Sequence, residues 1–197
     1  MEGLLPFALA GLALTGSPGP ATLSLAAVGA AFGARRGLSY MAGIVAGVLV
    51  VMAVTATGVT GLVLALPGAA PAVAALAAVY VIYLAFRIAT APPLSNGTGR
   101  GRPPSIAGSF FLALVNPKAY AVMAALFSGF ALAPDRPESD VVLKAGLLLV
   151  IMITVDLAWL LAGAALARVC RRPRVNRAIN LGFATLLVAS VALALLL

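Results

Sequence analysis

Histidine is absent from this sequence, and cysteine occurs once, as Cys170. A single cysteine cannot form an internal disulfide, and a membrane carrier of thiol redox equivalents would need a pair of cysteines within its helices. Zinc-dependent catalysis is also hard to build without histidine or paired cysteines. We therefore expect no enzymatic centre, no bound metal ion and no cofactor.

Charged residues are scarce as well: they make up 9% of the chain, whereas 63% of it is hydrophobic. A soluble domain is typically about 25% charged. A soluble protein of 197 residues could not bury this much apolar surface, but a bilayer acts as a solvent for it. The acidic residues number five: Glu2, Asp135, Glu138, Asp140 and Asp156. This composition predicts an integral membrane protein.

Six apolar segments each supply the roughly 20 residues that a membrane-spanning helix needs. They cover residues 4–32, 38–66, 72–90, 106–133, 141–167 and 178–197. The connections are short except for residues 91–105, where proline, glycine and polar residues indicate a flexible linker. We therefore predict an all-α fold with six transmembrane helices in a single domain.

The basic residues predict the orientation, because cytoplasmic loops carry an excess of Lys and Arg. Ten of the 13 basic residues lie at the first, third and fifth loops, and these are Arg35, Arg36, Arg87, Arg100, Arg102, Arg168, Arg171, Arg172, Arg174 and Arg177. We expect these loops to be cytoplasmic and both termini to lie outside. The net charge of +8 suits a membrane surface; we expect no nucleic-acid partner, because the basic residues separate apolar runs instead of forming a patch.

The linker divides the chain into two halves of three predicted helices each, residues 1 to about 90 and about 106 to 197. An odd number of spans gives the two halves opposite orientations, so a duplicated unit would form an inverted repeat, as in many secondary transporters. The first segment of each half carries prolines at corresponding places: the sequence Gly-Ser-Pro-Gly-Pro at 16–20 and Asn-Pro-Lys at 116–118. The pattern favours two inverted three-helix repeats.

Both proline motifs predict a break in the helix near the middle of the membrane. Proline in a helix interior removes a backbone hydrogen bond and clashes with the preceding turn. The freed carbonyls then need partners from the protein or from trapped water. After each break, a half-helix begins whose N-terminus offers amide groups and positive potential to an anion such as a carboxylate.

Lys118 and Asp156 are the charges that we place near the bilayer midplane. Charges at this depth are rare and usually mark a pathway or a coupling site. A structural alternative is that the two form a buried ion pair between the fourth and fifth helices. Trp159 follows Asp156 by three residues and shares its helix face.

Two pairs of glycines at G-x-x-x-G spacing predict close helix packing. They are Gly29 with Gly33 in the first segment, and Gly43 with Gly47 in the second.

These motifs resemble the lysine-exporter (LysE/RhtB) family over nearly the whole chain. The resemblance is carried by Gly-Ser-Pro-Gly-Pro at 16–20, Gly-Ala-Arg-Arg-Gly-Leu at 33–38, Gly-Ile-Val-Ala-Gly at 43–47, Tyr-Leu at 83–84, Asn-Pro-Lys-Ala-Tyr at 116–120 and Asp-Leu-Ala-Trp at 156–159. It implies a six-helix inner-membrane exporter of amino acids that is driven by the proton gradient. Two stretches depart from the family pattern, Phe-Ser-Gly-Phe at 127–130 and Ala-Phe at 85–86, and they bear on the identity of the substrate.

We therefore predict a secondary exporter of amino acids or similar small zwitterions, whose partners are its solute, protons and the bilayer; association into homo-oligomers is left open. Asp156 is the candidate proton-coupling group. The predicted substrate-binding residues are Ser17, Pro18, Gly19, Pro20, Asn116, Pro117, Lys118, Asp156 and Trp159. The alternatives are an exporter of another small solute or of a cation, a passive channel, and an accessory membrane subunit.

Overall fold

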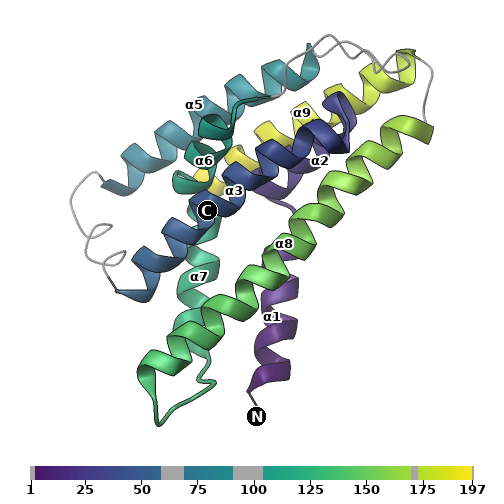
Figure 1. The fold of residues 1–197 in the computed structure, drawn as a ribbon. Coiled ribbons are helices and arrows are strands. Elements are labelled where there is room, and N and C mark those ends of the chain that lie inside the picture. Colours follow the sequence, from purple (N-terminus) through teal and green to yellow (C-terminus); the bar gives the residue numbers. More distant parts are fainter. Residues whose placement is uncertain (1–2, 59–68, 91–103, 170–172, 197) are drawn as a thin grey trace.

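The computed structural model describes residues 3–58, 69–90, 104–169 and 173–196, and these residues form eight helices and no strand (Figure 1). The helices are α1 (Leu4–Gly16), α2 (Pro20–Phe32), α3 (Ala34–Ala56), α5 (Ala69–Ala89), α6 (Ile106–Leu114), α7 (Pro117–Gly129), α8 (Pro137–Val169) and α9 (Pro173–Leu196). The prediction of an all-α fold is thus confirmed for the described residues. Most of the predicted linker, residues 91–103, lies outside them.

Each predicted apolar segment overlaps one helix or one pair of helices. Within the described residues, α3 and α8 are each long and apolar enough to cross a membrane, and the bent pair α6–α7 counts as a third crossing. The helices α1 and α2 are apolar but have only 13 residues each. Length and composition therefore support a membrane protein, while the arrangement of six spans in two repeats stays a prediction.

The predicted helix breaks coincide with helix boundaries in the structure. Between α1 and α2, the residues Ser17 to Gly19 are not helical, and Pro20 occupies the first turn of α2. Between α6 and α7, the chain bends by 57°, and Pro117 again opens the second helix. Proline suits this position because the first amide of a helix has no partner within the helix.

Glycines allow two pairs of helices to pack with their backbones close together. A Cβ atom on Gly43 would collide with α6 at Ser109 Oγ and the Ile106 carbonyl, and one on Gly47 would meet Phe110 O at 2.7 Å. A Cβ atom on Gly29 would strike the Leu160 carbonyl of α8. The packing prediction therefore holds for these three glycines.

Gly33 has a different role from the one that its spacing predicts. Its φ is +83°, and a Cβ atom placed on it would meet nothing within 4 Å. It forms the turn between α2 and α3, where a left-handed conformation favours glycine over any residue with a side chain.

Large apolar side chains cover much of the outer surface. Leu5, Val79, Phe86 and Val142 are each more than 60% exposed, and transfer of such apolar surface from water into lipid is favourable. The interior lies where α2 packs against α8 and α9, and α3 packs against α6, α7 and α8. Figure 1 shows α8 as the long helix that crosses the whole molecule, with α1 and α7 beside its N-terminal half.

Candidate functional site

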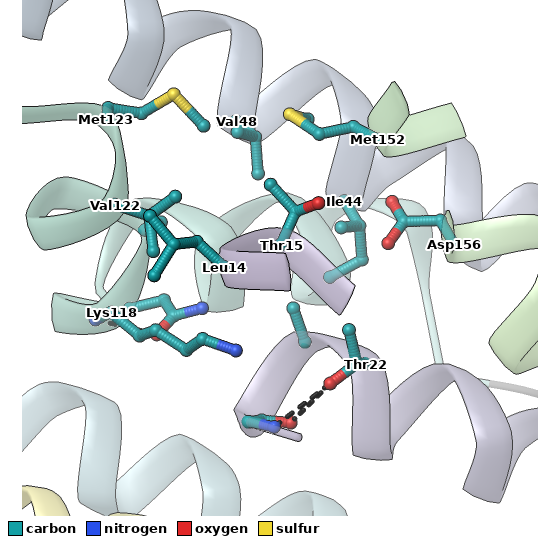
Figure 2. A pocket seen from close by; sticks show the side chains of 14 residues that line it. Leu14, Thr15, Thr22, Ile44, Val48, Lys118, Val122, Met123, Met152 and Asp156 are labelled. Carbon is teal, nitrogen blue, oxygen red and sulfur yellow. Dashed lines mark hydrogen bonds between the residues drawn. The ribbon is translucent and has the colours of Figure 1, made fainter. Parts of the chain in front are cut away.

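A pocket lies where the two helix breaks meet, walled by α1, α2, α3, α7 and α8. Its free volume is about 60 Å³. A single water molecule needs roughly 10–15 Å³, so a pocket of this size suits a small solute. It is lined by Leu14, Thr15, Gly19, Ala21, Thr22, Ile44, Val48, Asn116, Lys118, Ala119, Val122, Met123, Met152 and Asp156 (Figure 2).

Lys118 joins the second break to the first. Its ammonium group donates a hydrogen bond of 2.5 Å to the Ser17 carbonyl and approaches the Pro18 carbonyl at 3.4 Å. A Cβ atom on Gly19 would lie 2.8 Å from Lys118 Cδ, so the absence of a side chain at Gly19 allows this approach. The cation therefore satisfies carbonyls that the break has released from helical bonding.

Two further side chains form hydrogen bonds with the backbone at the first break. The indole of Trp159 donates to the Gly16 carbonyl at 3.2 Å. The hydroxyl of Thr22 accepts a hydrogen bond from the Gly19 amide at 3.0 Å and lies 3.2 Å from the Gly19 carbonyl. Hydrogen bonds from Lys118, Trp159 and Thr22 therefore restrain the non-helical turn, and this restraint fixes the position of the α2 N-terminus.

The two half-helix N-termini differ in the amides that they offer. At α7, the Asn116 side chain accepts from the Lys118 amide at 3.2 Å, and the Asn116 carbonyl accepts from the Ala119 amide at 3.0 Å. At α2, the described residues provide no acceptor for the amides of Ala21 and Thr22. The expectation that both N-termini would offer free amides therefore has geometric support at α2, and less at α7.

Asp156 is the acidic residue among the side chains that line the described pocket. It is 5% exposed, its Oδ2 atom has no hydrogen-bond partner, and no described side chain forms an ion pair with it. Figure 2 shows Asp156 and Lys118 reaching the pocket from opposite sides, with Thr15 between them. Burying a carboxylate without a partner is unfavourable. The Oδ2 atom of Asp156 is therefore an acceptor that a donor entering the pocket could satisfy.

The alternative of an ion pair between Lys118 and Asp156 does not match the structure. Within the described ranges, the one ion pair joins Lys144 to Asp140 at 2.6 Å. There Asp140 also accepts from the Ala133 amide at 2.8 Å, so this pair fixes the turn before α8. No described group of three metal-ligating side chains forms a candidate metal site either.

The predicted site residues fall into two groups. The lining of the pocket includes Gly19, Asn116, Lys118 and Asp156. The remaining predicted residues are Ser17, Pro18 and Trp159, which shape the first break through their backbone or side-chain contacts, and Pro20 and Pro117, which begin α2 and α7.

Sequence reasoning missed Thr15, Thr22, Met123 and Met152, which also line the pocket. For Thr22 a weak signal existed, because the third residue after a candidate N-cap is where a capping box places the side chain, usually Glu or Gln, that bonds back to the cap. The others are ordinary residues of apolar helices, and their spacing alone does not distinguish them.

Comparison with known proteins identifies the family to which this chain is similar. The family model of the LysE type translocator matches residues 12–197. The cysteine/O-acetylserine efflux protein of Escherichia coli (strain K12) is 31% identical over 172 residues, which cover 87% of each chain. Proteins of the same name from Shigella sonnei (strain Ss046) and Shigella flexneri match equally. No solved structure matches significantly.

Proposed function

We propose that this chain, which belongs to the LysE type translocator family, exports small neutral amino acids across the bacterial inner membrane in exchange for protons. Relatives that are 31% identical are named as efflux proteins for cysteine and O-acetylserine. Both compounds are small zwitterions with no net charge. The proposal for this chain is therefore a substrate of that chemical class.

The observation that carries the proposal is that one basic side chain, Lys118, and one acidic side chain, Asp156, line one small pocket from opposite sides (Figure 2). The carboxylate of a zwitterion would meet Lys118 and the free amides at the start of α2, and its ammonium group would meet Asp156. An unpaired charge at the membrane midplane costs at least about 2.5–3.5 kcal/mol, so a site for a zwitterion needs both partners. A dibasic amino acid would need a second carboxylate and would be repelled by Lys118.

Asp156 is also the group that we propose for proton coupling. The described part of the pocket contains no other carboxylate, and the chain contains no histidine. A carboxylate that alternately binds a proton and the ammonium group of the solute would couple the two movements in opposite directions. The pocket would then open to the two sides of the membrane in turn, as one three-helix half of the chain moves relative to the other around the site.

Efflux from proteoliposomes tests the proposed function. Vesicles containing the purified protein are loaded with radiolabelled cysteine, serine, leucine or lysine and diluted into buffer with an imposed pH gradient. We expect export of cysteine and serine that depends on the gradient, slower export of leucine, and none of lysine. Export of lysine at the rate of serine would contradict the charge argument, and efflux without any dependence on the gradient would indicate a passive channel.

The proposed orientation places the loop with Arg35 and Arg36 and the linker in the cytoplasm, and both termini outside. A Cys170→Ser background allows single cysteines to be placed at Asn96 and at Asp135, in the linker and in the loop before α8. We expect an impermeant thiol reagent added to intact cells to label the cysteine at 135 but not the one at 96. Labelling at 96 and protection at 135 would reverse the topology.

A further inference from the structure

The pocket has an apolar side as well as a charged one. Val48 of α3, Met123 of α7 and Met152 of α8 line the same pocket as Lys118 and Asp156. Figure 2 shows the two methionine side chains reaching toward Val48 from its two sides, on the side of the pocket away from Lys118. Valine offers no hydrogen-bonding atom in its side chain, and the methionine sulfur is only a weak acceptor. We call Val48, Met123 and Met152 the apolar wall.

The two methionines lie just beyond the charged residues, toward the same end of the pocket. On α8, Met152 precedes Asp156 by four residues, so both lie on one helix face. On α7, Met123 follows Lys118 by five residues. Four to five residues correspond to about 6–7.5 Å along a helix. Because α7 ends and α8 begins at the connection formed by residues 130–136, both steps run toward that connection.

The apolar wall limits the space that a solute can occupy. Its three side chains are buried and belong to one hydrophobic cluster. The free volume of about 60 Å³ holds roughly four to six water-sized groups, so a long solute side chain must displace part of the wall. Val48 is β-branched and stiff at χ1, whereas methionine is unbranched and adapts to irregular space. The methionines are therefore the part of the wall that yields to a solute.

On the basis of the proposed function, we propose that the apolar wall binds the side chain of the solute, and that Met123 and Met152 set the largest side chain that is exported. An α-amino acid carries its carboxylate, its ammonium group and its side chain on one carbon. With the carboxylate at Lys118 and the ammonium group at Asp156, the side chain turns toward the apolar part of the pocket. A short, weakly polar side chain such as the thiol of cysteine suits this surface, whereas leucine has to push the methionines aside.

Shortening the two methionines tests the proposal through the relative export of two solutes. Efflux of radiolabelled leucine and cysteine is measured at equal concentrations, with a reductant present, from proteoliposomes of one preparation, so the amount of folded protein cancels in their ratio. We expect the leucine-to-cysteine ratio to rise at least about 10-fold in Met123→Ala/Met152→Ala, because one methylene in an apolar pocket changes discrimination by roughly 10-fold or more. In Val48→Ile, which adds one methylene to the wall, we expect the ratio to fall by a similar factor.

Leu187→Ala is the control for a cavity made elsewhere in the protein. Leu187 is buried like the apolar wall, but its helix, α9, contributes none of the described lining residues, so the ratio should stay at the wild-type value. The single variants Met123→Ala and Met152→Ala provide the answer if the double variant does not fold. An unchanged ratio in the methionine variants, or an equal change in the export of both solutes, would overturn the proposal, because the wall would then only seal the pocket. Failure of the wild-type protein to export any amino acid would instead reject the proposed function.

Discussion

Replacing Asp156 by asparagine is expected to abolish proton-coupled export while leaving the protein folded in the membrane. Asparagine has nearly the same shape but cannot ionise, so it offers the solute no negative charge and the proton no acceptor. Leaving the ammonium group of the solute unpaired at this depth costs at least about 2.5–3.5 kcal/mol, which corresponds to roughly a 100-fold loss of rate or affinity. Loss of the coupling proton removes the remaining gradient-driven export.

The structure gives a reason to expect that Asp156→Asn folds. The Oδ2 atom of Asp156 is buried and has no partner, so the substitution breaks no hydrogen bond at this atom. The measurement is efflux of labelled serine from proteoliposomes at several imposed pH gradients. Asp135→Asn is the matched control, since it makes the same chemical change on an exposed residue outside the pocket. Export by Asp156→Asn at the wild-type rate, with the same pH dependence, would show that Asp156 is structural.

Replacing Lys118 by alanine is expected to weaken export mainly through the affinity for the solute, with KM raised at least about 10-fold. The ammonium group would no longer be present to pair with the carboxylate of the solute. The same substitution removes the donor to the Ser17 and Pro18 carbonyls. We therefore also expect a lower thermal stability, because unsatisfied buried carbonyls are costly.

A second variant separates these two effects of Lys118. In Gly19→Ala the charge is retained, but the new Cβ atom would lie 2.8 Å from Lys118 Cδ and 3.1 Å from its Nζ. The side chain must shift, so we expect a smaller rise in KM than in Lys118→Ala. Arg136→Ala removes an exposed cation as the control. Kinetics of serine efflux and the melting temperature in detergent are measured for all three. Wild-type KM in Lys118→Ala would remove Lys118 from the binding site.

Helices and breaks were predictable from the sequence because they depend on local chemistry. Long apolar runs form helices in lipid, where backbone groups must bond within their own segment. The prolines at 18, 20 and 117 interrupt regular helix, because proline lacks an amide hydrogen and clashes with the preceding turn. Gly43 and Gly47 likewise indicated close packing, since small residues at this spacing allow two helix backbones to approach.

The partners of the polar groups could not be read from the sequence, because they come from residues far apart in the chain. The interval between Lys118 and Ser17 is 101 residues, and Trp159 bonds to Gly16 across 143 residues. Lys118 and Asp156 both line the pocket, but Lys118 bonds to the first break and the Oδ2 atom of Asp156 stays without a partner. Which of two buried charges finds a partner depends on how the helices pack.

The sequence by itself determined that this chain is helical, apolar and broken at two proline motifs, because composition and proline chemistry act within a few residues. Only the tertiary structure decided that the amides of α7 are capped by Asn116 whereas those at the start of α2 are free. The physical reason is that hydrogen-bond satisfaction is a property of the packed interior, where each donor competes for acceptors that packing brings near.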